Sequence, residues 1–276
     1  MGQQEIREQI NLKYECNGGY QRIFGKSFVK ENKENIELII NGEKLDLIDV
    51  YELKEGENNI KLIIKNKIIN LSNMFKWCKK LKNIEELKYL NTFYCTNFGC
   101  MFSGCSSLSD IKSLEKWNVS NGKDFYNMFN GCSSLSDIKS LEKWNVSNGI
   151  KFSGMFSGCL SLLDIKPLEK WNVSKGTDFS YMFYECSSLS NIKSLENWNV
   201  SNGVYFNDMF SGCSSLSDIK PLEKWNFSNG RNFSFMFYEC YSLSDIKSLE
   251  NWNVTSGNIF HHMFSRCISL IHIKLL

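Results

Sequence analysis

Cysteine is the residue whose spacing in this 276-residue chain most invites chemistry. Clustered thiolates can hold zinc or pair into disulfides, but zinc sites usually contain Cys-x-x-Cys, which the sequence lacks. Stacked repeats would keep the Cβ atoms of neighbouring cysteines ~4.8 Å apart, beyond the usual ~3.5 to 4.5 Å of a disulfide. We therefore predict buried thiols that act as small hydrophobic residues, and no metal or other cofactor. Eight of the eleven cysteines recur at a constant spacing, at Cys78, Cys105, Cys132, Cys159, Cys186, Cys213, Cys240 and Cys267.

The three histidines, His261, His262 and His272, do not form a recognisable site. Two adjacent residues cannot easily present both rings to one metal, and no acidic partner lies at ligand spacing. Phosphate-binding, dinucleotide-binding, calcium-binding and hydrolase motifs are also absent from the sequence. We therefore predict that the protein is not an enzyme.

An asparagine follows six of the seven tryptophans and begins an Asn-x-Ser/Thr sequon. In a secretory pathway these side chains could carry glycans. The alternative, which we favour, is a structural ladder in which each side chain bonds backbone groups of the next turn. The six residues are Asn118, Asn145, Asn172, Asn199, Asn226 and Asn253.

Composition excludes several classes of protein. The chain is 42% hydrophobic and 22% charged with a net charge of +2, so it has the material for a core and no basic patch for nucleic acid. Lysines interrupt the most apolar stretch, residues 60–69, so we predict no membrane insertion. The opening residues, 1–8, are polar and acidic, unlike a secretory signal, which favours a cytoplasmic protein.

A 27-residue repeat must position these side chains. The pair Met-Phe recurs eight times with this spacing, from Met74 to Met263, and such short units must stack into a solenoid. In the unit that starts at Met128, apolar residues spaced three and four apart over residues 125–132 predict a short helix. Apolar residues then recur every third position, from which we predict a tight coil with a very short parallel strand near Ile138.

The N-terminal part of the chain, residues 1–70, differs from the repeats. Hydrophobic residues alternate over 10–14 and 60–64, and Asn41-Gly42 between two apolar runs predicts a β-hairpin. We predict a β-rich domain over residues 1–70 that covers the first coil of a solenoid over residues 71–276. The chain stops mid-repeat at residues 273–276, so either the last coil is open to self-association or the array was once longer.

The repeats resemble a known family. Met-Phe-x-x-Cys-x-Ser-Leu followed by Trp-Asn-Val-Ser, as in residues 128–147, is similar to BspA-like leucine-rich-repeat surface proteins. That family includes a domain of unknown function first noticed in mycoplasmas. Over residues 74–276 the resemblance implies a leucine-rich-repeat-like solenoid with surface display, adhesion and protein binding. Two features depart from the family, because its commoner Trp-Asp-Thr-Ser is absent and no secretory signal is visible, so cytoplasm and cell surface both stay open.

Positions that vary between the units form a stripe that mixes aromatic and charged residues, as protein interfaces do. Relaxed constraint on a solvent face is the alternative explanation. We predict a non-enzymatic scaffold for protein–protein interaction, with a surface adhesin or antigen as the alternative. The candidate binding residues are Tyr126, Lys151, Tyr181, Tyr205, Arg231, Phe235, His261 and His262.

A longer period, of two repeat units, overlies the basic repeat. The units that start at Met182 and Met236 share a Tyr-Glu pair, Tyr184-Glu185 and Tyr238-Glu239. The units before each of them share a proline. A two-unit segment has therefore been duplicated, which suits a binding surface of adjustable length.

Overall fold

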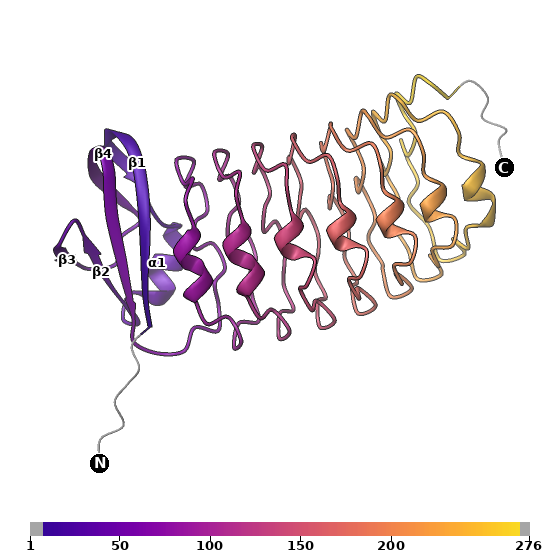
Figure 1. The fold of residues 1–276 in the computed structure, drawn as a ribbon. Coiled ribbons are helices and arrows are strands. Elements are labelled where there is room, and N and C mark those ends of the chain that lie inside the picture. The colour runs from indigo at the N-terminus through magenta and orange to yellow at the C-terminus, as the bar shows by residue number, and fades with distance from the viewer. Residues whose placement is uncertain (1–7, 271–276) are drawn as a thin grey trace, which may run out of the picture.

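A computed structural model describes residues 8–270 of the chain. Its N-terminal part is a four-stranded antiparallel sheet with strand order β1-β4-β2-β3 (Figure 1). The predicted hairpin is confirmed, because Ile40 pairs with Glu43 across a turn in which Asn41 and Gly42 have φ values of 50° and 91°. The elements are β1 (Glu8–Arg22), α1 (Lys26–Asn32), β2 (Ile36–Ile40), β3 (Glu43–Leu45) and β4 (Val50–Ile64).

Beyond the sheet, a row of short 3-10 helices marks the repeat (Figure 1). Their first residues are 27 positions apart, so a solenoid of 27-residue repeats is confirmed. We number its coils 1 to 8 by their Met-Phe pairs, from Met74 to Met263. The helices are η1 (Glu85–Tyr89), η2 (Lys112–Lys116), η3 (Lys139–Leu141), η4 (Lys166–Leu168), η5 (Lys193–Leu195), η6 (Lys220–Leu222) and η7 (Lys247–Asn251).

The helix predicted over residues 125–132 is wrong. Asn127 and Gly131 have φ values of 52° and 71°, in the left-handed region that ends a right-handed helix. Separate turns replace it, such as the one that the Met128 N–H closes on the Phe125 carbonyl at 3.2 Å. Alternate N–H groups instead donate to the next coil, including that of Phe125 to the Lys151 carbonyl at 2.9 Å. Hydrophobic residues three and four apart therefore mark two linked turns here, not a helix.

The parallel strand predicted near Ile138 is confirmed at one place only, because among the described residues it is a single bridge between Asp164 and Asn191, at the equivalent position of coils 4 and 5. The recurring parallel bridge joins Asp124 to Lys151 and the equivalent residues of other coils, whereas the segment after Ile138 forms helix η3. An apolar residue at every third position fits the three residues per turn of a 3-10 helix. The recurring extended residues therefore lie just before the predicted helix, and a 3-10 helix follows the position predicted for the strand.

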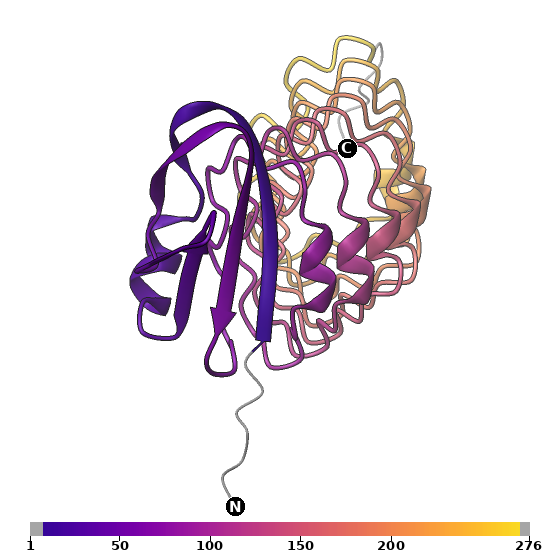
Figure 2. The same ribbon diagram turned by 60° about the vertical axis from the view of Figure 1, so that its left-hand side comes forward.

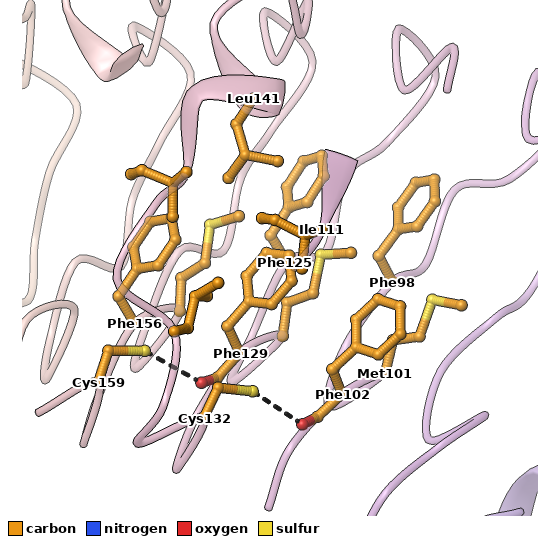
Figure 3. Close-up of a cluster of buried hydrophobic side chains, with 14 of the residues drawn as sticks. Phe98, Met101, Phe102, Ile111, Phe125, Phe129, Cys132, Leu141, Phe156 and Cys159 are labelled. Atoms are coloured by element: carbon orange, nitrogen blue, oxygen red, sulfur yellow. Dashed lines mark hydrogen bonds between the residues drawn. The ribbon is translucent and has the colours of Figure 1, made fainter. Parts of the chain in front are cut away.

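Identical side chains stack along the core in ladders. Successive phenylalanine rings such as Phe102 and Phe129 lie 5.6 Å apart and nearly parallel. The buried thiols donate to carbonyls of the preceding coil, Cys132 to Phe102 at 3.2 Å and Cys159 to Phe129 at 3.3 Å (Figure 3). All eleven cysteines are buried and free, which confirms the predicted role of these thiols in the core.

The two ends of the solenoid differ. The sheet lies against the first coil in both views, and the Gly25 N–H donates to the Met74 carbonyl at 2.9 Å (Figures 1 and 2). In the last described coil, Phe260 is 40% exposed, whereas the equivalent Phe233 is fully buried. The opening residues 1–7, His272 and the predicted open end at residues 273–276 lie outside the described residues, so self-association stays a prediction.

Candidate interaction surface

Each coil turns outward at two left-handed positions, four residues apart. We call the stretch from two residues before each methionine to three residues after it the turn segment. Glycine fits a positive φ without strain, yet bulky residues occupy several of these positions. The first position holds Asn73, Cys100, Asn127, Gly154, Tyr181, Asp208, Phe235 and His262, and the second holds Trp77, Gly104, Gly131, Gly158, Glu185, Gly212, Glu239 and Arg266.

The predicted binding residues fall into two rows. Three of them, Lys151, Tyr205 and Arg231, lie just before the turn segments, where the backbone pairs with neighbouring coils. There the Lys151 ammonium lies 3.7 Å from the Asp124 carboxylate. The other five lie on turn segments and are Tyr126, Tyr181, Phe235, His261 and His262.

The structure brings the C-terminal members of the second row together. The Phe235 ring lies 5.2 Å from that of His261 and 5.0 Å from that of His262. Tyr181 makes its aromatic contact with Tyr184 at 5.7 Å. Tyr126 is 44% exposed and lies apart from the others, on coil 3. The stripe is therefore densest over coils 5 to 8.

Sequence reasoning missed several residues of this surface. Tyr184 and Tyr238 contact the predicted aromatics, and the Arg266 guanidinium lies 2.6 Å from Glu239 and 5.6 Å from the Tyr238 ring centre. The repeated Tyr-Glu pair could have indicated these residues, because both copies of a duplicated pair occupy the same position in their coils. What the sequence did not reveal is the arginine that reaches the second pair.

Tyr184 is partly buried and lies near several carboxylates. Burial, a hydrogen bond to Glu185 and the nearby carboxylates of Asp208 and Glu239 raise the pKa of Tyr184 to about 12. Burial also raises the pKa of Asp208, although hydrogen bonds from Asn207 and Tyr181 oppose this. Coils 5 and 6 thus present an aromatic and acidic surface.

Among residues 8–270, no group of three or more histidine, cysteine or acidic side chains is arranged to hold a metal ion. His261 and His262 lie with ring centres 5.8 Å apart in an edge-on arrangement. His262 Nδ1 instead lies 3.1 Å from the Ser265 hydroxyl. This pair therefore belongs to the aromatic surface.

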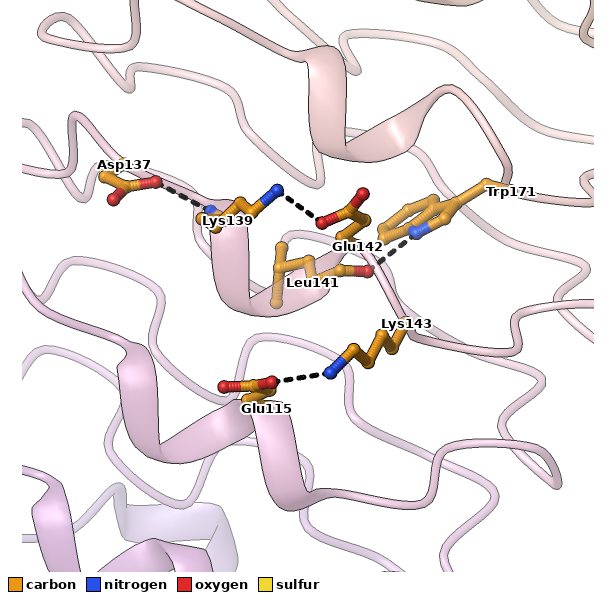
Figure 4. A network of polar contacts seen from close by, with 7 residues as sticks. All are labelled: Glu115, Asp137, Lys139, Leu141, Glu142, Lys143 and Trp171. Carbon is orange, nitrogen blue, oxygen red and sulfur yellow. Dashed lines mark hydrogen bonds and ion pairs between the residues drawn. The ribbon is translucent and has the colours of Figure 1, made fainter.

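The 3-10 helices carry a different, charged surface. Lys143 bridges to Glu115 of the preceding coil at 3.0 Å, and Lys139 pairs with Glu142 within its own coil (Figure 4). Such exposed pairs contribute roughly 0 to 1 kcal/mol each. Shallow grooves of about 460 to 540 Å³ lie between η1, η2, η3 and η4, and lysine and acidic residues line them. This surface repeats from coil to coil, whereas the turn segments vary.

Comparison with protein families identifies the repeats. Residues 48–164 and 162–272 both match the family described as Mycoplasma protein of unknown function, DUF285. The chain belongs to the DUF285 family. This confirms the mycoplasma-type part of the predicted resemblance, and the narrower BspA-like assignment stays a prediction. As a DUF285 protein it has no match among the curated proteins or the solved structures that we compared. In the described part of the chain, every helix is too short or too polar to cross a membrane.

Proposed function

We propose that this DUF285 protein is a non-catalytic scaffold that binds another protein through the turn segments of coils 5 to 8. One observation carries the proposal: outward positions there gather aromatic and charged residues, while the core columns repeat almost unchanged. Exposed aromatic side chains such as Tyr181, which is 41% exposed, supply most of the energy in protein interfaces.

The backbone supports such a role because it holds the outward residues rigidly. The N–H groups of Tyr181 and Glu185 donate to carbonyls of the next coil at 3.0 and 2.7 Å. Phe235 and Glu239 are held in the same way at 3.1 and 3.0 Å. Side chains on a rigid backbone lose less conformational freedom when a partner binds. We also propose that the solenoid is of the leucine-rich-repeat type.

Site-specific photo-crosslinking in the native cell tests the scaffold. A photoreactive phenylalanine analogue at position 235 should give discrete protein adducts, whereas the analogue at Lys166, on the charged helix surface, should not. Both positions lie on the solenoid and carry long side chains, so the pair controls for nonspecific labelling. Equal adducts from both positions, or none from position 235, would contradict the proposal.

A surface adhesin or antigen is the second candidate, and the sequon asparagines favour it. All six are exposed, and each side-chain oxygen accepts the N–H two residues later, as Asn145 does from Ser147 at 3.1 Å. The predicted backbone ladder is thereby confirmed. Within residues 8–270 the six Nδ2 groups, the atoms that accept glycans, make no hydrogen bond. Glycan mass on protein purified from its native source would support this candidate, and an unmodified mass would contradict it.

A further inference from the structure

Coils 5 and 7 carry two copies of one arrangement. The first consists of Tyr181, Tyr184 and Glu185, and the second consists of Phe235, Tyr238 and Glu239. We call them the first and the second Tyr-Glu motif. They are two repeat units apart, so coil 6 lies between them and each is followed by one coil that packs against it.

The two motifs have the same geometry. The aromatic rings meet edge to face in both, at 5.7 Å in the first motif and 5.5 Å in the second. Glu185 and Glu239 both adopt left-handed backbone conformations, with φ values of 55° and 58°. Each glutamate N–H donates to the serine carbonyl of the next coil, that of Ser211 or that of Ser265. A group that binds the tyrosine ring and the glutamate of one motif therefore finds the same pair at the other.

The second motif already binds a guanidinium group of this chain. Arg266, which follows Glu239 by one repeat unit, lies 2.6 Å from the Glu239 carboxylate. Its guanidinium carbon is also 5.6 Å from the centre of the Tyr238 ring. A carboxylate beside an aromatic face is a favourable environment for arginine, which combines an ion pair with a cation–π contact.

Glycine stands at the equivalent position of the first motif. Gly212 follows Glu185 by one repeat unit and packs on it, because a Cβ added there would lie 3.1 Å from Glu185 Cγ. No basic side chain of residues 8–270 lies within 4.0 Å of the Glu185 or Asp208 carboxylate. Asp208 takes the place of His262, so the first motif has a second acid where the other has a histidine.

We propose that the first Tyr-Glu motif binds an arginine side chain of a basic segment in the partner protein, as the second motif binds Arg266. This deepens the proposed scaffold function and rests on it. Charge complementarity selects the occupant, because Glu185 and Asp208 present two carboxylates beside Tyr181 and Tyr184. Lysine fits less well, since its ammonium group has neither the planar fork nor the stacking face of arginine.

The backbone conformations of the two Tyr-Glu motifs are consistent with a binding role for them. Four coils place glycine at the second left-handed position, where it is unstrained, whereas coils 5 and 7 place glutamate there and coils 1 and 8 place Trp77 and Arg266. Tyr181 and Phe235 occupy the first position with φ values of 57° and 56°, which bulky residues rarely adopt. Strained residues cluster where a protein uses them.

Calorimetric titration with a tetraarginine amide tests the proposal. The wild-type chain should bind one peptide, more weakly as ionic strength rises, and should bind tetralysine several-fold more weakly. Gly212→Arg should lower the affinity at least tenfold, because the new side chain takes the place that Arg266 takes beside Glu239. Gly131→Arg is the matched control: it adds the same charge at a left-handed glycine that lies over Gly104.

Two further variants separate the outcomes. Glu185→Gln should weaken binding without a change in shape, and Arg266→Gly should free the second motif and raise the stoichiometry to two. Absence of binding, or equal losses in Gly212→Arg and Gly131→Arg, would overturn the arginine site. If Gly212→Arg fails to fold, Glu185→Gln decides. A crosslinked partner at position 235 together with unchanged peptide binding in Glu185→Gln would leave the scaffold standing and refute this site.

Discussion

The middle of the solenoid and its last described coil contain the same residue types in very different surroundings. Phe233 and Trp225 are almost completely buried between two neighbouring coils, whereas Phe260 is 40% exposed and Trp252 is half-buried. Burial of an apolar side chain is worth ~25 cal/mol per Å², so the same residue stabilises the middle far more than the end. The stability that a coil gains from its own aromatic residues therefore depends on the coils that cover them.

Alkaline pH should destabilise the solenoid through its buried thiols. Burial raises the pKa of Cys132 and Cys186 to about 12, against about 11 for Cys267 in the last coil. A thiol whose pKa is raised in the folded protein stabilises it fully below the pKa of the unfolded chain, about 8.5. This stabilisation is lost as the pH rises from there toward the pKa of the folded protein. Each such thiol should remove about 1.4 kcal/mol per pH unit across that window, which urea denaturation measures.

The double variant C132A/C186A provides the matched control for this pH effect. It lacks two of the responsible thiols, so its free energy of unfolding should fall less steeply between pH 9 and pH 11 than that of the wild type. An unchanged slope would show that the buried thiols do not cause the alkaline loss.

Replacing one tryptophan in the middle of the solenoid and one in its last described coil measures how much each ring stabilises the protein. Trp171→Ala removes a buried ring whose Nε1 donates to the Leu141 carbonyl at 3.0 Å, and it should cost about 3 to 5 kcal/mol of unfolding free energy. Trp252→Ala removes the same contact with Leu222 from a half-buried site and should cost clearly less. Equal losses in chemical denaturation would refute the dependence on neighbours.

Weakening the contact between the sheet and coil 1 should leave coil 1 partly uncovered, as the last described coil is. A Cβ at Gly25 would lie 2.0 Å from the Asn73 carbonyl oxygen, so Gly25→Ala must shift backbone. We expect a loss of about 1 to 3 kcal/mol, as for other overpacked sites. Faster amide exchange should appear in coil 1 and not in coil 5. Gly42→Ala adds a Cβ that meets nothing within 4 Å but strains a backbone with a φ of 91°, so it should destabilise the hairpin without faster exchange in coil 1.

A feature of the fold could be predicted from the sequence when the residues that determine it lie close together along the chain. The Asn41-Gly42 hairpin and the sequon turns depend on residues two to four apart, and both predictions were correct. The helix over residues 125–132 failed because spacing alone does not report that Asn127 and Gly131 have positive φ. Of the predicted binding stripe, the grouping of Phe235 with His261 required the contact between coils 7 and 8.

The amino-acid sequence by itself determined the repeat period and the core columns, because these are patterns along one dimension. Tertiary structure alone decided which segment of each coil is extended and which is a 3-10 helix, since the stacked backbone fixes those conformations. It also decided that Arg266 lies on Glu239 while Gly212 lies on Glu185. Those contacts join residues one full repeat apart, which meet only when each coil packs on the one before it.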